Sequence, residues 1–403
     1  MSILSGKNIL LGITAGIAAY KTASLVRLFI KAGANVKVVM TPASKEFVTP
    51  LTLSTLSKNP VYSSFTNEED ENATWNNHVE LGLWADLFLV APATANTMSK
   101  MATGNSDNFL LATYLSAKCP VYFAPAMDLD MYKHQSTKNT FDALVDFGNI
   151  MIPATSGELA SGLHGEGRMT EPEDIITFIE NDVIGKLPLR GKKVLLTAGP
   201  THEAIDPVRF LGNRSTGKMG FEIAKALANK GAEVVLVSGP TSQTISHSLV
   251  NIIAVTSAQE MYDACHLHFK NVDVAILSAA VADFKPKNIA NQKIKKTGDS
   301  LQIELVRTQD ILASLGAIKN KQILVGFALE TNNEVENAKG KLKKKNLDLI
   351  VLNSLNDKGA GFGGSTNKVT FIDKNNSIKE FDLKSKAAVA KDITQEIIKF
   401  LDA

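Results

Sequence analysis

The chain has 403 residues, of which 44% are hydrophobic and 21% are charged, a composition typical of a globular protein with two or three domains. Its 43 basic and 41 acidic side chains nearly balance, so we expect no nucleic-acid or membrane partner. Two cysteines, Cys119 and Cys265, argue against a disulfide framework and a thiolate metal site. The start lacks a signal-peptide pattern and no apolar run approaches the length of a membrane span, so we expect a cytoplasmic protein.

Apolar runs alternate with amphipathic segments through the first half of the chain. This alternation predicts an α/β fold with a doubly wound, mainly parallel (Rossmann-like) sheet. The expected strands are 8–13, 36–40, 86–91, 120–124 and 149–152, and the expected helices lie near 17–32, 44–57, 107–116, 135–147 and 172–184.

A charged stretch at 181–193, punctuated by glycine and proline, interrupts this alternation before it begins again. We therefore expect one domain at 1–184, a linker at 185–190 and a second domain of the same Rossmann-like class at 191–403. Its expected strands are 193–198, 233–237, 273–278, 323–328, 348–352, 368–373 and 378–382, and its expected helices lie near 217–230, 257–269, 309–318, 334–345 and up to about 401.

Two loops with glycines, within 9–21 and 194–220, each follow an apolar strand and open a helix. Such loops let backbone N–H groups approach a phosphate. A dinucleotide-binding dehydrogenase would need GxGxxG and an acidic residue about 20 positions later. Thr41 and Pro42 stand at that place in the first half, and Ser238 and Gly239 in the second, so the sequence argues against a dehydrogenase.

Small hydroxyl and amide residues follow successive strands of the first half, in the segments 14–16, 44, 91–97 and 104–108. At the carboxyl edge of a parallel sheet they can hydrogen-bond a phosphate and a flat polar ring system. The blocks ITAGIAAYK at 13–21, HVELGLWADLFLVAPATANT at 78–97 and PAMDLDMY at 125–132 resemble the flavin-containing cysteine decarboxylases. The similarity continues through 157–169 and into the second half. Over about 2–400 the chain is similar to the bacterial bifunctional coenzyme A biosynthesis family, a phosphopantothenoylcysteine decarboxylase fused to a phosphopantothenate–cysteine ligase.

For the first domain this resemblance implies FMN and a reaction in which oxidation of the cysteinyl thiol allows loss of carbon dioxide, followed by reduction. His78 matches the family's catalytic histidine, and imidazole is well suited to moving a proton near neutral pH. Met127, Asp128 and Met131 would line the substrate side, and 157–167, with Ser161, resembles a flap that closes over it. The implied FMN-binding residues are Thr14, Gly16, Ser44, Ala93, Thr94, Asn96, Thr97, Asp107 and Asn108.

Two positions depart from the family's usual pattern. The family has Asn where this chain has Asp128, and Cys where it has Ser161. An Asn amide can donate to a substrate carboxylate, whereas an ionised Asp would repel it by roughly 1 to 4 kcal/mol at about 4 Å. Asp128 must therefore be protonated, displaced or working on another group. A serine hydroxyl is also a far weaker acid than a thiol, so the proton for the reductive step would come from Ser161, a water or Asp128.

For the second domain the resemblance implies CTP-dependent joining of 4′-phosphopantothenate to cysteine through an acyl-cytidylate. Asn213 and Lys293 match catalytic residues, Arg209 and Ala279 would contact substrate, and Asp283 would serve the nucleotide or its Mg²⁺. Lysines such as Lys293, Lys295, Lys296 and those at 339–345 ordinarily form a solvated face, but they also supply the local positive charge that a triphosphate needs. The chain has no Walker loop, which argues against an ordinary ATPase. The implied CTP-binding residues are Asp283, Lys293, Gln309, Asp310, Ile311, Phe327, Lys341 and Lys345.

The family further implies a homo-oligomer with a trimer-based flavoprotein core and dimeric ligase domains. Asp128 and Ser161 leave a competing interpretation open, an active ligase fused to a flavin-binding module that assembles or regulates without completing decarboxylation. An oxidative decarboxylase of cysteine-bearing peptides is a third interpretation, against which the fused ligase argues.

Overall fold

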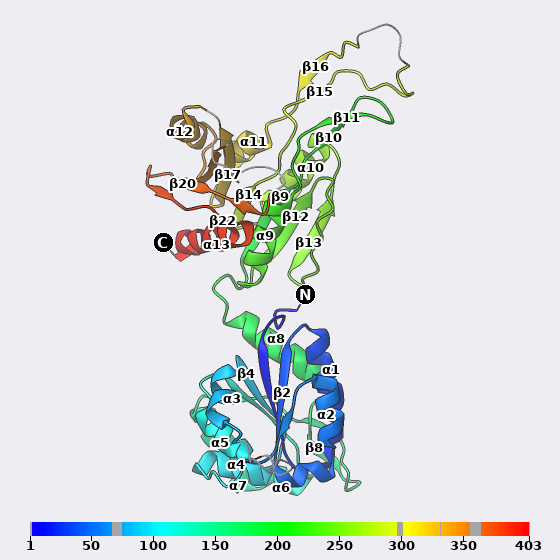
Figure 1. The fold of residues 1–403 in the computed structure, drawn as a ribbon, viewed down its shortest axis with the longest axis vertical. Coiled ribbons are helices and arrows are strands. Elements are labelled where there is room, and N and C mark those ends of the chain that lie inside the picture. The colour runs from blue at the N-terminus through cyan, green and yellow to red at the C-terminus, as the bar shows by residue number, and fades with distance from the viewer. Residues whose placement is uncertain (1, 67–74, 296–300, 331, 355–363, 403) are drawn as a thin grey trace. The chain divides into compact units, whose positions relative to one another are not determined.

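The computed structural model describes residues 2–66, 75–295, 301–330, 332–354 and 364–402. The chain forms two compact units, Met1–Val183 and Ile184–Ala403, and each has its own central sheet (Figure 1). Among the described residues, no helix combines the length and the hydrophobicity that a bilayer-spanning segment needs.

The first unit contains a six-stranded sheet in which every pair of neighbouring strands is parallel. Its strands are β1 (Asn8–Ile13), β2 (Asn35–Met40), β3 (Val61–Tyr62), β4 (Leu87–Ala93), β5 (Val121–Pro125) and β6 (Ile150–Met151). The spatial order is β3-β2-β1-β4-β5-β6, so the chain reverses its direction of travel across the sheet between β1 and β4. The predicted doubly wound parallel sheet is confirmed, and the short strand β3 is an addition to it.

Helices cover both faces of this sheet, and Figure 1 shows α1 and α2 on one side and α3, α4 and α5 on the other. An antiparallel hairpin of β7 (Thr155–Glu158) and β8 (His164–Arg168) stands apart from the sheet. The helices are η1 (Ile17–Lys21), α1 (Thr22–Lys31), η2 (Pro42–Glu46), α2 (Pro50–Ser57), α3 (His78–Trp84), α4 (Ala95–Thr103), α5 (Phe109–Ser116), α6 (Leu129–Lys133), α7 (Gln135–Asp146) and α8 (Pro172–Gly185).

The core of the first unit follows directly from the apolar strands and the amphipathic helices. Five of the six residues of β1 are buried, as expected for a central strand that is covered on both faces. Helix α1 buries Leu25, Val26 and Phe29, which share one helical face. On the other side of the sheet, Gly82 lets α3 approach the end of α5, because a Cβ at this position would lie 2.8 Å from the backbone oxygen of Ser116.

The second unit contains an eight-stranded sheet in the order β13-β12-β9-β14-β17-β18-β20-β21. The first six strands of this order are parallel, and β20 and β21 add antiparallel neighbours at one edge. Its strands are β9 (Lys193–Ala198), β12 (Glu233–Ser238), β13 (Val250–Ala254), β14 (Val274–Leu277), β17 (Ile323–Glu330), β18 (Leu349–Ser354), β20 (Val369–Asp373) and β21 (Ile378–Glu380). The predicted mainly parallel sheet is confirmed here as well. Strand β13, none of whose residues is fully buried, was not predicted.

Three short antiparallel pairs lie outside this sheet: β10 (His202–Ala204) with β11 (Phe210–Gly212), β15 (Phe284–Pro286) with β16 (Leu305–Arg307), and β19 (Thr366–Asn367) with β22 (Lys384–Ser385). One hydrophobic cluster joins α9 and α13 to one face of the sheet, and another joins α10, α11 and α12 to the opposite face. The helices are α9 (Lys218–Ala228), α10 (Ala258–Phe269), α11 (Ile311–Ile318), α12 (Glu334–Lys344) and α13 (Lys386–Asp402). Leu189, within the expected linker, is fully buried in the first of these clusters.

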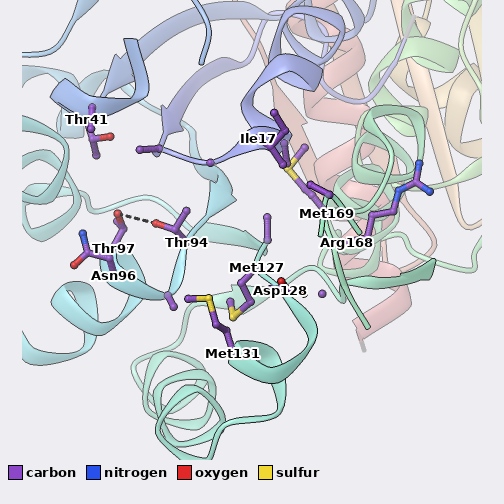
Figure 2. A pocket seen from close by; sticks show the side chains of 18 of the residues that line it. Ile17, Thr41, Thr94, Asn96, Thr97, Met127, Asp128, Met131, Arg168 and Met169 are labelled. Carbon is purple, nitrogen blue, oxygen red and sulfur yellow. Dashed lines mark hydrogen bonds between the residues drawn. The ribbon is translucent and has the colours of Figure 1, made fainter. Parts of the chain in front are cut away.

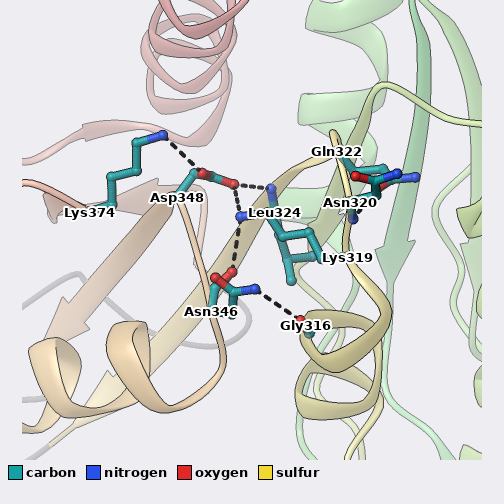
Figure 3. Close-up of polar contacts among 8 residues, drawn as sticks. All are labelled: Gly316, Lys319, Asn320, Gln322, Leu324, Asn346, Asp348 and Lys374. Atoms are coloured by element: carbon teal, nitrogen blue, oxygen red, sulfur yellow. Dashed lines mark hydrogen bonds and ion pairs between the residues drawn. The ribbon is translucent and has the colours of Figure 1, made fainter.

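A largely buried carboxylate, Asp348, joins β18 to the neighbouring strand and to the loop that follows α11 (Figure 3). Its Oδ2 accepts hydrogen bonds from Lys319 Nζ at 2.6 Å and from the backbone N–H of Leu324 at 2.8 Å. Lys374 Nζ lies 3.5 Å from Oδ1. Lys319 Nζ also donates to the backbone oxygen of Asn346 at 3.1 Å, so this cluster fixes the start of two adjacent parallel strands.

Candidate functional site

A cavity of about 910 Å³ opens in the first unit at the carboxyl edge of the parallel sheet. Its walls come from the segments that follow β1, β2, β4 and β5, together with the β7–β8 hairpin. The cavity therefore lies where β1 and β4 diverge, which is where doubly wound sheets bind their ligands. Its volume is in the range of about 300–1,000 Å³ that small-molecule sites occupy.

One wall of the cavity is rich in hydrogen-bond donors. The N-termini of η1 and α4 face it, and neither has a side chain that caps its first N–H groups. Gly16 precedes η1, and a Cβ there would come within 3.3 Å of Thr94 Cγ2. Figure 2 shows Thr94, Asn96 and Thr97 gathered on this side, with Thr94 Oγ1 3.4 Å from Thr97 Oγ1. Uncapped helix N-termini of this kind favour an anionic group such as a phosphate.

Six of the nine residues predicted to bind FMN line this cavity: Gly16, Thr94, Asn96, Thr97, Asp107 and Asn108. The other three, Thr14, Ser44 and Ala93, are fully buried behind its wall. Thr14 Oγ1 donates to the backbone oxygen of Pro92 at 2.7 Å, and Ser44 Oγ donates to that of Thr41 at 2.7 Å. These two hydroxyls are thus engaged with the loops that form the wall.

The cavity also has charged lining residues that the sequence did not single out. Lys21, in η1, has only 6% of its side chain exposed and donates to the backbone oxygen of Met169 at 3.0 Å and to Glu171 at 2.8 Å. The hydrogen bond from Lys21 lowers the pKa of Glu171 against the opposing effect of burial, and Arg168 lowers it further. Lys21 lies 148 residues from Met169 in the chain, so no local pattern could have pointed to this contact.

The predicted substrate side is built by the loop between β5 and α6. Met127, Asp128 and Met131 line the cavity together, opposite the donor-rich wall (Figure 2). Asp128 is the N-cap of α6, and its Oδ1 accepts the backbone N–H of Leu129 at 2.7 Å. The same oxygen accepts a hydrogen bond from Ser161 Oγ at 3.0 Å. The two residues that depart from the family pattern are therefore direct partners.

The hairpin of β7 and β8 contributes Glu158, Ser161 and Arg168 to the cavity wall. It lies against the Asp128 loop, where the backbone N–H of Met127 donates to the oxygen of Gly167 at 3.0 Å. Gly167 has φ +135°, and a Cβ on it would lie 2.4 Å from the backbone oxygen of Met127. Only glycine permits this approach without displacement of the loop.

His78 is not among the residues that line this cavity. It is the first residue of α3, and its ring packs edge-on against Phe65, Trp75 and Phe109 with centroid distances of 5.9, 6.4 and 6.4 Å. Its Nδ1 is buried and has no hydrogen-bond partner among the described residues. The structure does not bring His78 together with Asp128 and Ser161 within one unit.

In the second unit, the loops after β9 and β14 meet at the carboxyl edge of the sheet. Pro200 and Ala280 form a bridge between them, and the Ala279 N–H donates to Thr197 Oγ1 at 3.1 Å. The amide of Asn213 donates to the backbone oxygens of Ala280 and Val281, each at 3.0 Å. Two predicted residues, Asn213 and Ala279, thus lie in one pair of joined loops.

Arg209 is held by its own chain. Its Nε donates to Asp206 Oδ2 at 2.9 Å, a terminal nitrogen forms an ion pair with the same carboxylate, and that nitrogen also donates to the backbone oxygen of Ile294 at 2.9 Å. Asp206 Oδ2 accepts the Ile294 N–H at 3.1 Å. These bonds attach the segment that carries the exposed Lys293 to the loop after β9. Lys296, its neighbour in the predicted lysine group, lies outside the described residues.

Four of the residues predicted to bind CTP are linked by direct contacts. Lys345 forms an ion pair with Asp310 at 2.7 Å, and Lys341 Nζ donates to the backbone oxygen of Phe327 at 2.8 Å. Burial lowers the pKa of Lys341, and the charge of Lys345 lowers it further. The N-terminus of α11 is capped by Asp310, which accepts the Ala313 N–H at 2.9 Å.

The remaining predicted nucleotide residues differ in their exposure. Gln309 and Asp283 are exposed, whereas Ile311 belongs to the hydrophobic core. Within the described part of the chain, no group of three histidine, cysteine, aspartate or glutamate side chains is placed to hold a metal ion. An Mg²⁺ ion at Asp283 would therefore need further ligands from the nucleotide phosphates.

Comparison with known proteins agrees with this division into two units. Residues 2–184 match the family model "Flavoprotein", and residues 189–401 match "DNA/pantothenate metabolism flavoprotein C-terminal domain". A protein of an unknown prokaryotic organism named "Cysteine/Cysteine sulfinic acid decarboxylase" is 54% identical over 356 residues, covering 87% of this chain and 99% of the relative. The "Coenzyme A biosynthesis bifunctional protein CoaBC" of Bacillus subtilis (strain 168) is 45% identical over 397 residues, covering 98% of this chain and 97% of the relative.

A solved structure of the C-terminal domain of a Coenzyme A biosynthesis bifunctional protein CoaBC is 45% identical, covers 54% of this chain and 99% of its own, and has a TM-score of 0.47. The two matching family models and the relatives that extend over nearly the whole chain establish the relationship. This chain belongs to the family of the bifunctional coenzyme A biosynthesis proteins, in which a flavoprotein domain is joined to a DNA/pantothenate metabolism flavoprotein C-terminal domain.

Proposed function

We propose that the chain is a bifunctional enzyme of coenzyme A biosynthesis. The domain at 191–403 joins 4′-phosphopantothenate to cysteine with CTP, and the domain at 1–184 decarboxylates the product to 4′-phosphopantetheine with FMN. The observation that supports this most directly is the cavity at the carboxyl edge of the first sheet, whose lining matches six of the nine residues expected for FMN. The relationship to CoaBC along 98% of the chain supports the pairing of the two activities.

The volume of the cavity and the donors on its wall support FMN as its ligand. The uncapped N-termini of η1 and α4 offer backbone N–H groups to a phosphate, and Gly16 keeps that wall free of a side chain. Thr94, Asn96 and Thr97 add hydroxyl and amide groups that can bond the polar atoms of a flavin ring. When bound, FMN supplies reversible two-electron oxidation of the substrate thiol.

The chain's own residues position the substrate and exclude water. Met127 and Met131 line the cavity and would provide apolar contacts to the substrate, and the β7–β8 hairpin lies against the loop that carries Asp128. In the net reaction the bond between the α-carbon and the carboxylate breaks, carbon dioxide leaves, and the α-carbon gains a proton. The electrons taken from the thiol return to the product, so no external oxidant is consumed.

A homo-oligomer would bring His78 to the chemistry. The surface around it carries exposed apolar side chains, Trp75 at 58%, Val79 at 43% and Leu83 at 58% exposure. Ile17 and Tyr20, at the rim of the cavity, are each 62% exposed. Contact between these two apolar surfaces of neighbouring subunits would bury both and would place His78 against a neighbour's cavity. We propose a trimer-based flavoprotein core on this ground, with dimeric ligase domains by analogy with the family.

In the ligase domain, we propose that CTP activates the substrate carboxylate as an acyl-cytidylate before cysteine attacks. Lys293 would stabilise charge at the reacting phosphate, and Lys341 and Lys345 would hold the triphosphate once their present partners yield to it. Asn213 would orient the acyl group from the joined loops, and Asp283 would bind Mg²⁺ together with the nucleotide phosphates.

The relative named for cysteine and cysteine sulfinic acid introduces a second candidate substrate for the first unit, an unmodified amino acid. The observation that favours it is Asp128, a carboxylate on the substrate side of the cavity. Decarboxylation of cysteine would yield cysteamine, again by loss of carbon dioxide and gain of a proton at the α-carbon.

The alternative to both substrates is an active ligase fused to a flavin-binding module that does not complete decarboxylation.

One experiment tests these proposals together. The purified protein is incubated with 4′-phosphopantothenate, cysteine, CTP and Mg²⁺, and every product is identified by mass. Saturated 4′-phosphopantetheine and CMP are the expected products. Accumulation of phosphopantothenoylcysteine would leave only the ligase, and a product two hydrogens lighter than 4′-phosphopantetheine would show that the reduction is missing.

A further inference from the structure

The two residues that depart from the family pattern join separate segments of the first unit. Ser161 lies in the turn between β7 and β8, and Asp128 is the N-cap of α6. Ser161 Oγ lies 3.0 Å from Asp128 Oδ1, across 33 positions of the chain. Among the described residues, this is the only hydrogen bond that connects the turn at 159–163 with a segment outside the hairpin.

The direction of this hydrogen bond follows from the second partner of the carboxylate oxygen. Asp128 Oδ1 also accepts the backbone N–H of Leu129 at 2.7 Å, so this oxygen acts as an acceptor and carries no proton. The Ser161 hydroxyl must therefore be the donor. Its proton is engaged with Asp128 for as long as the contact lasts.

The strands of the hairpin and its turn are held in different ways. A two-stranded hairpin is only marginally stable in water, and β7 and β8 form a two-stranded sheet of their own. Strand β8 packs closely on the loop before it: a Cβ on Gly165 would lie 2.5 Å from Leu129 Cδ1, and the oxygen of Gly167 accepts the Met127 N–H at 3.0 Å. The turn has one side-chain hydrogen bond in place of such packing.

The turn forms part of the cavity wall, because Leu159, Ala160 and Ser161 all line the cavity. Gly162 has φ +83°, and its N–H donates to the backbone oxygen of Leu159 at 2.9 Å, so the turn maintains its own shape. It can therefore move as a unit and open this part of the wall. Ser161 is exposed and Asp128 is half-buried, so water can replace either partner when the hydrogen bond breaks.

We propose that Ser161 and Asp128 form a reversible latch, which holds the turn at 159–163 in the cavity wall, and that Ser161 is a positioning residue of the decarboxylase. This inference rests on the decarboxylase function proposed above and gives one shared role to the two departures from the family pattern. Because its hydroxyl proton is engaged with Asp128, Ser161 does not supply the proton of the reductive step while the latch is closed.

Hydrogen–deuterium exchange of the FMN-loaded full chain, measured by mass spectrometry, tests the latch. The exchange rate of the amides at 159–163 follows the fraction of molecules in which the turn is released. Ser161→Ala should raise this rate about fivefold, the effect of one partly exposed hydrogen bond. Ser161→Thr keeps the hydroxyl and Asp128→Asn keeps both the acceptor oxygen and the N-cap, so each should stay within about twofold of the parent.

Ser156→Ala is the matched control, because Ser156 is an exposed serine of β7 whose side chain forms no hydrogen bond among the described residues. It should change the exchange rate by less than about twofold. Asp128→Ala removes the acceptor, so adding Ser161→Ala to it should raise the rate by less than about twofold more. A parent-like rate in Ser161→Ala, or full additivity in the double variant, would overturn the latch.

The mass of the product separates positioning from proton transfer. The parent and Ser161→Ala are each incubated with phosphopantothenoylcysteine, and the ratio of 4′-phosphopantetheine to the species two hydrogens lighter is measured. A positioning role predicts the same ratio for both proteins and a higher KM for Ser161→Ala. A shift to the lighter species in Ser161→Ala alone would refute that role. If the parent releases no carbon dioxide but the exchange rates are as expected, the decarboxylase is refuted and the latch is supported.

Discussion

Substitution of Asp348 by alanine should destabilise the second unit strongly. The carboxylate has 10% of its surface exposed and Lys319 has 11%, so the substitution leaves a buried ammonium without its charged partner (Figure 3). The buried Leu324 N–H also loses its side-chain acceptor. Removing one partner of a buried ion pair costs about 3–5 kcal/mol. Lys319 keeps its bond to Asn346, which favours the lower part of this range.

A loss of about 3 to 4 kcal/mol corresponds to a fall of about 10 °C in the melting temperature of a unit of this size. The control is Lys374→Ala, because Lys374 is 58% exposed and contacts the same carboxylate at 3.5 Å. Exposed ion pairs contribute about 0–1 kcal/mol, so the melting temperature of this variant should change little. Asp348→Asn should fall between the two, since an amide oxygen can still accept the Leu324 N–H.

Intrinsic fluorescence separates the two units in this assay. Both tryptophans, Trp75 and Trp84, lie in the first unit, so tryptophan emission follows that unit alone, whereas far-ultraviolet circular dichroism follows both. Asp348→Ala should lower the melting temperature of the second unit, which is seen by circular dichroism and not by tryptophan fluorescence. The melting temperature of the first unit, followed by tryptophan fluorescence, should stay unchanged. Similar melting temperatures for Asp348→Ala and Lys374→Ala would refute the reasoning.

Four further predictions concern the two sites and the thiols. Lys293→Gln should lower the rate of CTP-dependent ligation by about two orders of magnitude without loss of flavin. Lys295→Gln, at an exposed neighbouring position, should leave the ligation rate unchanged. Equal rates for Lys293→Gln and the parent would remove Lys293 from the mechanism. His78→Asn should abolish decarboxylation while FMN content, measured by absorbance, stays constant, because His78 does not line the cavity of its own subunit. Burial raises the pKa of Cys119 to about 11 and that of Cys265 to about 12, so iodoacetamide at pH 8 should label neither in the folded protein and both in urea, as read by mass. The hydrogen bond from Arg209 holds the pKa of Asp206 well below its usual value. The stability that this ionised carboxylate adds is present above its unfolded pKa of about 3.9 and is lost as the pH falls below that value. The difference in melting temperature between the parent and Asp206→Asn should therefore shrink below about pH 4.

The sequence by itself determined the two sheets, because each central strand is a continuous apolar run and each covering helix has an apolar face. Strands β1, β9, β12 and β17 begin within a residue of their predicted positions. The small residues after β1 and β4 were also readable, since parallel strands place their carboxyl ends at one edge. Most of the cavity's donor-rich wall was predictable for that reason.

Tertiary structure decided the elements that have no strong local pattern. Helix α4 begins directly after β4 with a polar sequence, and β10, β11, β15 and β16 have three residues each, so only their partners make them strands. The antiparallel edge of the second sheet also depends on tertiary structure, because β20 pairs with β18, the last strand of the parallel part of the sheet.

The contacts that define the substrate side are also tertiary. Ser161 and Asp128 are partners across 33 positions, Lys21 and Glu171 across 150, and Arg209 and Ile294 across 85. The sequence identified Asp128 and Ser161 separately as departures from a family pattern, but it left the role of the carboxylate open. Only the fold placed the serine on one of its oxygens, because a hydrogen bond between distant segments depends on the path of the whole chain rather than on the residues beside it.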